Sequence, residues 1–280
     1  MRQQELQRFS AQIRLETSKM LLKRGFGHLG GSFSIVETLA VLYGEIMKID
    51  PKNPTWEERD WFILSKGHAG PALYSTLALK GYFPLEWLST LNNNGTRLPS
   101  HPDRLRTPGV DCTTGSLGQG ISQAVGVAKS FQIDHKPNRV YCIVGDGELN
   151  EGQVWEAIQF AAHNKLNQFL LFIDENHKQL DGLTKDIMNP FDVKTKLEAF
   201  GFNTVRIKGN DEALILETIK QCHTVSDMPS CIVLDTIKGQ GVKFFEDLSD
   251  NHHVRFTNES ENELKAAIDV LEGKVKEESK

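Results

Sequence analysis

The sequence predicts an α/β fold: a doubly wound, mostly parallel sheet with helices on both faces. Short apolar runs rich in β-branched residues, at 139–144, 169–173 and 231–235, are typical of strands buried in a parallel sheet. Helical patterns at about 152–164 and 211–222 separate these runs along the chain. This β-α-β order indicates the doubly wound arrangement.

The other elements follow from the spacing of apolar residues. Residues 5–23 and 34–47 repeat apolar side chains at helical intervals, and 119–131 is predicted as a helix with small residues on one side. The run WFIL at 61–64 is predicted as a short strand, and NTVRI at 203–207 as a weaker one. With no internal repeat or low-complexity linker, these elements are assigned to one domain.

Two stretches lack this regular alternation. Residues 92–118 are rich in Gly, Pro, Asn and Thr, and a structureless stretch of that length in a compact domain is usually functional or disordered. The last twenty residues predict a weak amphipathic helix ending in a charged, solvated tail. We expect residues 1–258 to form the α/β domain and residues 259–280 to form the C-terminal helix and tail.

The composition bounds the class of protein. Among 280 residues, 39% are hydrophobic and 25% are charged, which excludes wholesale disorder. The formal charge of -5 favours neither nucleic acid nor an anionic membrane as a partner. No signal peptide and no apolar run of about 18 residues is visible, and the four cysteines are too widely spread to indicate zinc or disulfides. We expect a soluble, cytoplasmic protein.

One motif is misleading. Residues 25–30 read GFGHLG, a literal G-x-G-x-x-G, and Asp50 follows about 20 residues later. The dinucleotide-binding fingerprint requires a strand before its glycines, whereas the preceding segment here is predicted to be helical. We therefore do not predict a nicotinamide or flavin site at this motif.

A stronger pattern lies at two predicted strand ends. Asp146, between two glycines, follows the strand at 139–144, and Asn176 follows the next strand, 30 residues later. A right-handed crossover returns the chain to the same sheet edge, where ligands of open α/β sheets bind. Carboxylate and amide oxygens suit Mg²⁺ or Ca²⁺. The alternative is that both residues are ordinary turn residues with local hydrogen bonds.

Loops add further candidates. The Gly-rich segment at 113–120 opens the helix at 119–131 and offers backbone N–H groups to a diphosphate, unless it is only a packing turn. His28, His68 and His101 lie in loops bounded by Gly or Pro. Histidine titrates near neutral pH and suits proton transfer, although loop histidines are often simply surface groups.

With these residues identified, the sequence resembles the N-terminal, thiamine-diphosphate-binding half of a transketolase over about residues 10–255. The matching blocks occur in family order: GHLGG (27–31), LSKGHA (64–69), RLPSHPD (97–103), TTGSLGQG (113–120), GDGELNEGQVWEA (145–157), DENHKQLDG (174–182) and TIKGQG (236–241). Several blocks in order are more specific than any single motif. The resemblance implies the thiamine-diphosphate-binding α/β fold.

The resemblance also implies roles for individual residues. Mg²⁺, with Ca²⁺ possible, is held by Asp146, the Asn176 side chain and the Lys178 carbonyl. The residues assigned to the cofactor are His68, Gly115, Ser116, Leu117, Gly147, Glu148, Glu151, Glu156, Asn176, Lys238 and His252. Of these, Glu151 and Glu156 match interface glutamates that link two active sites. The histidines assigned to proton transfer and sugar contact are His28, His68, His101 and His252.

Some features depart from the family pattern. Asn251-His252-His253 replaces the usual tryptophan-histidine-glycine. Spacing from Lys238 favours His252 as the equivalent histidine and leaves His253 open. Lys66 and Lys238, without the family context, would be interpreted as surface charges.

The chain also stops before the pyrimidine-binding and C-terminal domains of a full transketolase. The resemblance therefore implies a second subunit that supplies them, in an α2β2 assembly. Together the two transfer a two-carbon ketol unit from a ketose phosphate to an aldose phosphate, as in the pentose phosphate pathway.

Two other enzymes and one non-enzyme stay open as alternatives. Deoxyxylulose-phosphate synthases share the GHLG and GDG blocks, and the α-subunits of 2-oxoacid dehydrogenases also form split complexes. The first usually carry a different block where this chain has SKGH at 65–68, and the second lack the SKGHA and SHPD blocks. A non-catalytic cofactor-binding protein is the third alternative, and the intact candidate site residues argue against it.

Overall fold

The computed structural model describes residues 3–277 of the chain. At its centre lies a five-stranded, fully parallel sheet with the strand order β2-β3-β4-β8-β7. Its strands are β2 (Trp61–Leu64), β3 (Val140–Gly145), β4 (Phe169–Glu175), β7 (Asn203–Lys208) and β8 (Ser230–Asp235). The predicted α/β fold and all five predicted strands are confirmed.

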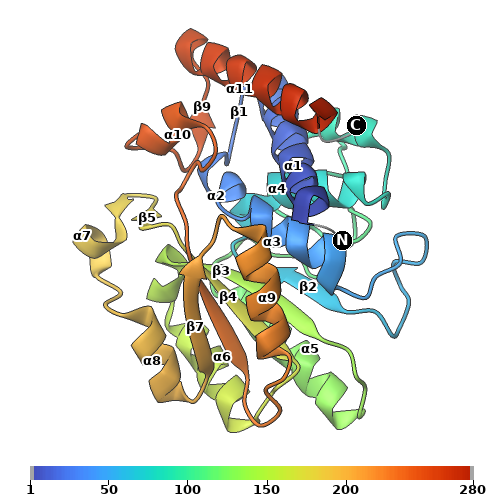
Figure 1. Cartoon of the computed structure of the whole chain (residues 1–280), viewed down its shortest axis with the longest axis vertical. Helices are drawn as coiled ribbons and strands as arrows, with labels where there is room; N and C mark the ends of the chain where they lie inside the picture. The colour runs from blue at the N-terminus through green and yellow to red at the C-terminus, as the bar shows by residue number, and fades with distance from the viewer. Residues whose placement is uncertain (1–2, 278–280) are drawn as a thin grey trace.

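Helices cover both faces of the sheet (Figure 1). One face carries α5 (Gln119–Ile133), α6 (Gly152–His163) and α8 (Val193–Phe200). The opposite face carries α1 (Gln3–Arg24), α3 (Val36–Val41), α4 (Gly70–Leu79) and α9 (Glu212–Cys222), with α11 (Asn258–Glu277) packed outside α1. The short helices are α2 (Gly30–Phe33), α7 (Thr184–Met188) and α10 (Lys243–Asp247). This is the doubly wound arrangement.

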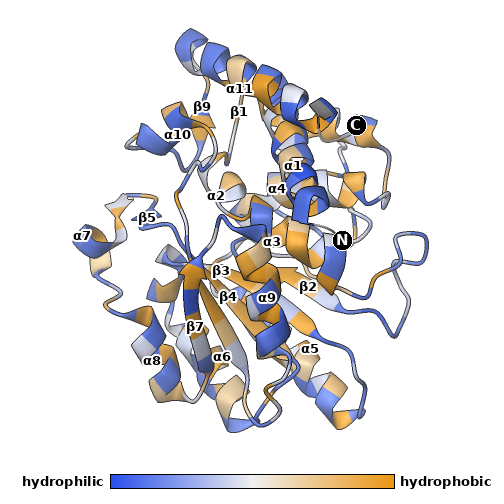
Figure 2. Ribbon diagram, viewed as in Figure 1, coloured by the Kyte–Doolittle hydropathy of each residue, from blue (hydrophilic) through white to orange (hydrophobic). Residues whose placement is uncertain are grey.

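The pleat of each strand divides the core into two layers. In β3, Tyr141 and Ile143 face the α1 side, whereas Val140, Cys142 and Val144 face the α5 side, and all five are fully buried. The central strands β3, β4 and β8 are therefore hydrophobic along most of their length, as the colouring of Figure 2 shows. This burial on both faces is why their sequence reads as continuous apolar runs rather than alternating ones.

The predicted helix at 34–47 is interrupted. It consists of α3 followed by a π-helical turn, Leu42–Ile46, that contains Gly44. Helix α4 was not predicted, because it is buried on all sides and its apolar residues show no helical stripe. Residues 92–118 form turns and bends, without a helix or a strand. A 3-10 helix, Leu85–Thr90, precedes this segment.

Two very short antiparallel pairings shape the site. Strand β1 (Phe26–Gly27) pairs with β9 (Val254–Arg255), and β5 (Lys178–Gln179) pairs with β6 (Gly182–Leu183). The first pairing brings residues from both ends of the chain together beside the sheet edge. The GFGHLG motif begins at Gly25, directly after α1. It therefore lacks the strand that precedes the glycines of a dinucleotide-binding site.

The C-terminal helix is part of the packed structure. It begins at Asn258, and its residues Leu264, Ile268 and Leu271 are buried in the same core cluster as α1. Lys19 of α1 forms an ion pair with Glu272 at 2.9 Å. The predicted helix is thus present and covers α1, while the final residues of the predicted tail, 278–280, lie outside the described residues.

This packing predicts the effect of truncating Leu264. Leu264→Ala should lower the free energy of unfolding by about 2–4 kcal/mol, because it leaves a cavity between α11 and the core. Val270→Ala, on the exposed side of the same helix, should change it by less than about 0.5 kcal/mol. Urea denaturation of the chain measures both values. Equal effects would show that α11 does not unfold with the core.

Candidate active site

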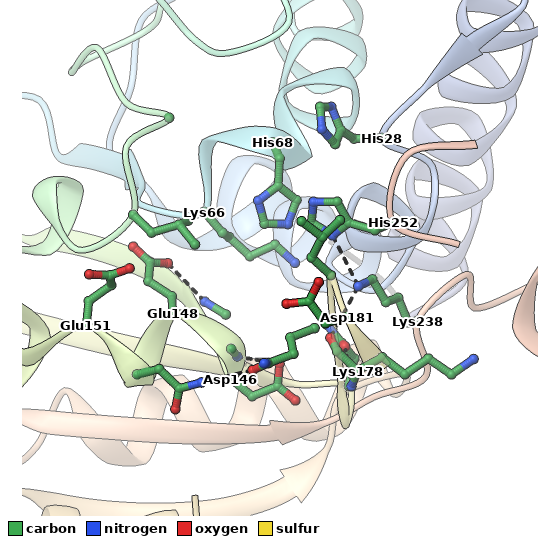
Figure 3. A pocket seen from close by; sticks show the side chains of 18 of the residues that line it. His28, Lys66, His68, Asp146, Glu148, Glu151, Lys178, Asp181, Lys238 and His252 are labelled. Atoms are coloured by element: carbon green, nitrogen blue, oxygen red, sulfur yellow. Dashed lines mark hydrogen bonds between the residues drawn. The ribbon is translucent and has the colours of Figure 1, made fainter. Parts of the chain in front are cut away.

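A cavity of about 390 Å³ opens at the carboxyl edge of the sheet. Figure 3 shows Asp146 and Glu148 on the sheet side of this cavity and His28, His68 and His252 across from them. Its lining combines strand ends with loops that are distant in sequence. The lining residues are His28, Lys66, His68, His101, Gly115, Leu117, Gly145, Asp146, Gly147, Glu148, Asn150, Glu151, Asn176, Lys178, Gln179, Leu180, Asp181, Lys238 and His252.

Asp146 lies directly beyond β3 and is 3% exposed. Its Oδ1 accepts a hydrogen bond from the Gly147 N–H at 2.8 Å, and its Oδ2 accepts one from the His177 N–H at 2.6 Å. Burial, followed by the nearby charge of Asp174, raises the pKa of Asp146 to about 7. Burial makes the ionised form of this carboxylate unfavourable, and a bound cation would stabilise that form.

Asn176 lies at the end of the neighbouring strand, β4, and is buried. Its Nδ2 donates to Asp174 Oδ2 at 2.8 Å, and its Oδ1 accepts from the Lys178 N–H at 3.2 Å. The His177 N–H bond to Asp146 ties the segment after Asn176 to Asp146. The convergence expected from the two strand ends is therefore present, together with the local turn hydrogen bonds of the alternative interpretation.

The Lys178 carbonyl accepts a hydrogen bond from Lys238 Nζ at 3.2 Å. The Lys178 side chain turns away, because its Nζ donates to the carbonyls of Glu246 and Leu248 at 3.1 and 2.9 Å. Lys238 is buried, and burial, followed by the charge of Lys66, lowers its pKa to about 8. Lys238 is thus part of the cavity wall and not the surface charge of the alternative interpretation.

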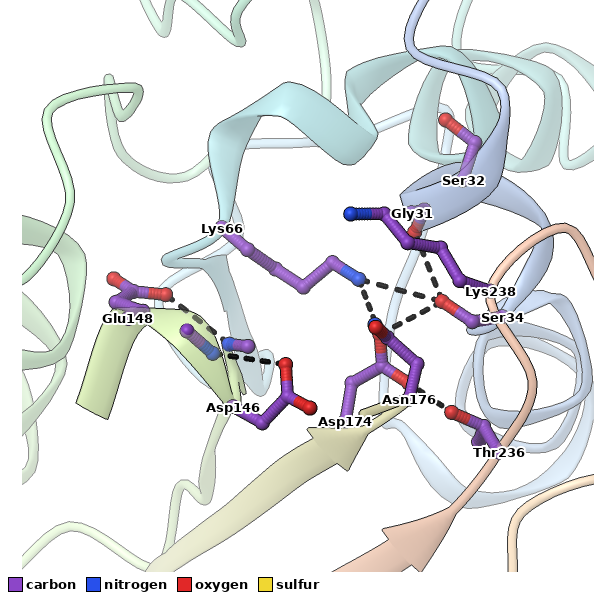
Figure 4. A network of polar contacts seen from close by, with 12 residues as sticks. Gly31, Ser32, Ser34, Lys66, Asp146, Glu148, Asp174, Asn176, Thr236 and Lys238 are labelled. Atoms are coloured by element: carbon purple, nitrogen blue, oxygen red, sulfur yellow. Dashed lines mark hydrogen bonds and ion pairs between the residues drawn. The ribbon is translucent and has the colours of Figure 1, made fainter. Parts of the chain in front are cut away.

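Sequence reasoning missed the polar network around Asp174, beside Asn176, which Figure 4 shows. Lys66 Nζ forms an ion pair with Asp174 Oδ2 at 2.5 Å, and the two side chains are 1% and 0% exposed. Burial raises the pKa of Asp174, but the Lys66 charge and the hydrogen bonds from Lys66, Thr236 and Ser34 together bring it below its usual value. The sequence offers a signal for one member only, because Lys66 lies two residues after the predicted strand at 61–64, in the SKGHA block.

Four histidines gather around His28, so that five imidazole rings form one cluster. Its ring centroid lies 5.7 Å from that of His68, 5.5 Å from His101, 5.3 Å from His252 and 4.8 Å from His253. The pairing of β1 with β9 brings His28, which follows β1, next to His252 and His253, which precede β9. His252 lines the cavity and its Nδ1 lies 3.2 Å from Lys238 Nζ, whereas His253 packs against Phe26 and lines a neighbouring groove.

The cavity keeps its histidines neutral. Burial, followed by the charges of His252 and His253, lowers the pKa of His28 to about 3. Burial, followed by the charge of Lys238, lowers the pKa of His252 to about 4. Burial also lowers the pKa of His68 and of His101. Neutral imidazoles near reacting groups can accept protons at neutral pH.

Glycines allow close approach to the cavity. A Cβ at Gly147 would lie 2.8 Å from the Gln179 Cβ, and one at Gly115 would lie 2.9 Å from the His101 ring. Gly115 also has φ +143°, which side chains rarely adopt. These positions form a cradle that larger residues would fill.

Some predicted residues occupy other places. Ser116 and Glu156 do not line the cavity, and both are exposed. Glu151 lies at its rim and is exposed. Glu148 lines the cavity, but its carboxylate accepts hydrogen bonds from Ser65 Oγ at 2.6 Å and from the N–H groups of Gly118 and Gly145 at 2.8 and 3.2 Å. The Glu148 carboxylate thus joins the segment after β2, the end of β3 and the loop before α5.

The donor set fits a hard divalent cation. Within residues 3–277, no group of three or more His, Cys, Asp and Glu side chains is placed to hold a metal ion. A cation at this floor would instead take one carboxylate, one amide oxygen and one backbone carbonyl. Such oxygen ligands suit Mg²⁺, which completes its shell with phosphate and water, and also Ca²⁺.

The fold and the cavity define an α/β protein with an anion- and cation-compatible site at the carboxyl edge of its sheet. Residues 6–271 match the family described as transketolase, thiamine diphosphate binding domain. The chain belongs to the transketolase family. The resemblance predicted from the sequence is thus confirmed, as is the enzyme class, a transferase of the transketolase type.

Two relatives have a similar length. The 6-deoxy-6-sulfo-D-fructose transketolase subunit SqwG of Clostridium sp. (strain MSTE9) is 50% identical, over 96% of each chain. One subunit of the apulose-4-phosphate transketolase of Actinobacillus succinogenes is 39% identical, over 81% of this chain and 82% of the relative. Because both are named as subunits, they imply a partner subunit for proteins of this length.

Solved single-chain transketolases share the fold. The transketolase of Campylobacter jejuni superposes with a TM-score of 0.86 at 31% identity, over 100% of this chain and 48% of that one. The chain therefore spans about half the length of that enzyme. Among the described residues, the structure has no helix long and apolar enough to cross a membrane, and all four cysteines are free.

The depressed pKa of His28 predicts acid sensitivity. Below pH 6.5 the unfolded chain binds a proton that folded His28 does not accept until pH about 3, so stability falls as the pH drops. Between pH 7 and pH 5, wild type should lose on the order of 1 kcal/mol more unfolding free energy than His28→Gln, allowing for solvent screening of a partly exposed ring. Urea denaturation at both pH values measures this. His163→Gln, at an exposed position, should follow wild type, and identical slopes for all three proteins would contradict the prediction.

Proposed function

We propose that this chain is the thiamine-diphosphate-binding subunit of a two-component, Mg²⁺-dependent transketolase. With a second subunit, it transfers a two-carbon ketol unit from a ketose phosphate to an aldose phosphate. One observation carries the proposal: Asp146 and Asn176 meet at neighbouring strand ends, on the floor of a cavity framed by glycines and neutral histidines. We further propose an α2β2 assembly, because such sites occur in pairs, and a cytoplasmic location.

The cation site is assigned to Asp146, Asn176 and Lys178. Asp146 and Asn176 supply side-chain oxygens, and Lys178 supplies the carbonyl that Lys238 now contacts. The raised pKa of Asp146 supports this, since a bound cation would stabilise its charged form. Mg²⁺ is preferred over Ca²⁺ where phosphate oxygens complete the shell.

The cofactor site is assigned to the glycine cradle and the basic wall. Gly115, Leu117 and Gly147 lie where backbone can approach a diphosphate, and Lys238, His68 and His252 form the opposite wall. When bound, the thiazolium ring supplies the electron sink that cleavage of a carbon–carbon bond next to a carbonyl needs. His28 and His101, neutral and close together, then accept and return protons at sugar hydroxyls.

The cations of the cavity wall are already engaged within the chain. Lys66 binds Asp174, the Nζ of Lys178 binds two carbonyls, and Lys238 contacts Lys178 and His252. We therefore assign recognition of the terminal anion of the sugar to the partner subunit. A sulfonated ketose is a second candidate donor, favoured by the 50% identity to the SqwG subunit, which is named for 6-deoxy-6-sulfo-D-fructose.

The proposal predicts the behaviour of Asp146→Ala. The chain, mixed with the polypeptide that carries the pyrimidine-binding and C-terminal domains, should transfer ketol units from a ketose phosphate or a sulfonated ketose. Asp146→Ala should lower this rate at least about a hundredfold, because it removes the carboxylate ligand of the cation. A coupled assay with several donors measures the rate, and calorimetry measures thiamine diphosphate binding with Mg²⁺.

The controls separate the alternatives. Turnover of pyruvate or another 2-oxoacid, and not of a ketose, would favour the synthase-like or dehydrogenase-like assignment. Binding of thiamine diphosphate without any turnover would favour a non-catalytic protein. Substantial turnover by the chain alone would remove the partner from the proposal.

An exposed apolar segment supports the partner. Leu180, Leu183, Ile187, Met188 and Phe191 form what we call the apolar segment, which runs from the β5-β6 hairpin through α7. Leu180, Met188 and Phe191 are 64%, 61% and 73% exposed. Leu180 also lines the cavity, so a subunit that covers the cavity would bury this segment. Contiguous exposed apolar residues are typical of such contact surfaces.

This assignment predicts weaker assembly of one variant. Replacing Ile187, Met188 and Phe191 by serine should weaken binding of the partner subunit at least about tenfold, because apolar area is no longer buried. The folded chain should be as stable as wild type, since these side chains are exposed. Ile133→Ser, also at an exposed apolar position but at the end of α5, is the matched control. Surface plasmon resonance measures both affinities, and equal values would contradict the assignment.

A further inference from the structure

Asp174 does not line the cavity, yet it is the most heavily bonded side chain beside it (Figure 4). Its Oδ2 accepts from Lys66 Nζ at 2.5 Å, Ser34 Oγ at 2.7 Å and Asn176 Nδ2 at 2.8 Å. Its Oδ1 accepts from Thr236 Oγ1 at 2.5 Å. The four donors follow four different elements, α2, β2, β4 and β8. One carboxylate therefore joins four segments at the sheet edge.

We propose that Asp174 and Lys66 are positioning residues that fix the Asn176 amide with its oxygen toward the cation site. This inference rests on the proposed function, since it concerns the cation assigned to Asp146 and Asn176. Neither Asp174 nor Lys66 contacts the cation or the diphosphate in this assignment. Both act through Asn176.

The chemistry of an amide explains the need for such a device. The two ends of an Asn side chain have nearly the same shape, so packing alone does not decide which end faces the cavity. An ionised carboxylate only accepts hydrogen bonds, and it therefore selects the N–H end of Asn176. The Lys178 N–H selects the opposite, oxygen end. One lone pair of that oxygen then stays available to a cation.

Lys66 is the charge that allows Asp174 to serve this role. Both side chains are fully buried, and a buried carboxylate without a paired cation would be strongly destabilising. Lys66 Nζ is engaged by Asp174 and lies 3.4 Å from Ser34 Oγ. The ammonium is thus turned toward Asp174, which distinguishes Lys66 from a lysine that binds phosphate directly.

The test is metal binding by the complex of the chain with its partner subunit, in the presence of thiamine diphosphate. Mn²⁺ serves as the probe, and electron paramagnetic resonance of free Mn²⁺ gives its affinity. Asp174→Asn should bind Mn²⁺ about 10–100-fold more weakly than wild type, the usual range for residues that orient a ligand. Thr236→Val removes one hydrogen bond to Asp174 and leaves the ion pair, so it should weaken Mn²⁺ binding about fivefold. This milder variant still tests the inference if Asp174→Asn does not fold.

The variant Lys66→Met separates two possible roles of Lys66, because they predict opposite changes in Mn²⁺ affinity. If Lys66 acted only as a nearby positive charge, its removal would tighten cation binding. As a positioning residue, its removal should weaken Mn²⁺ binding about tenfold, because Asp174 loses its fixed orientation. Tighter Mn²⁺ binding by Lys66→Met, or affinities of Asp174→Asn and Thr236→Val within twofold of wild type, would overturn the inference.

A second buried ion pair provides the matched control. Arg59 and Asp111 lie 2.7 Å apart with side chains 12% and 7% exposed, and Asp111 also accepts a hydrogen bond from the Phe62 N–H. Arg59→Met and Asp111→Asn should lower the melting temperature and leave Mn²⁺ affinity within twofold of wild type. Failure of the wild-type complex to bind thiamine diphosphate and Mn²⁺ would instead remove the proposed function, and this inference with it.

Discussion

The parallel pairing of β3 with β4 is the interaction on which the rest of the site depends. Its register places Gly145 beside Asp174, and the Asp146 N–H continues the pairing by donating to the Asp174 carbonyl at 3.1 Å. β8 continues the sheet on the other side of β4, with Asp235 beside Glu175. A slip of one residue in either pairing would turn the side chains of a strand to the opposite face. The two-layer core that fixes this register therefore also fixes the site.

Burial then decides the electrostatics at this edge. Lys66 compensates Asp174, whereas burial raises the pKa of Glu148 despite hydrogen bonds from Ser65, Gly118 and Gly145. Asp146 accepts hydrogen bonds only from backbone N–H groups, and burial, followed by the charge of Asp174, raises its pKa to about 7. The histidines across the cavity stay neutral, since burial and neighbouring cations both oppose their protonation. Burial thus raises the pKa of Asp146, which favours a bound cation, and lowers the pKa of His28 and His252, which leaves them neutral and able to accept protons.

The sequence predicts the elements that depend on local pattern. The five strands follow from β-branched runs, and Asp146 and Asn176 follow from their position after two of those strands. The network around Asp174 was not predictable, because Ser34, Lys66 and Thr236 meet only after three separate segments have folded onto one edge. The position of His28 depends on a two-residue pairing, β1 with β9, which is too short to leave a pattern. Ser116 and Glu156 were assigned by resemblance alone, and the cavity of this chain does not include them.

One parallel sheet thus sets the whole sheet side of the cavity. The floor supplies oxygens for a cation, a glycine cradle and neutral histidines, all set by one sheet. Leu180 and the rest of the apolar segment are exposed beside the cavity, at the surface that the proposal assigns to the partner subunit. The three lysines of the cavity wall are held by partners within the chain, so under the proposed function none of them distinguishes a phosphorylated from a sulfonated ketose. The proposal therefore divides the enzyme into a chain that carries the cofactor chemistry and a partner that selects the sugar.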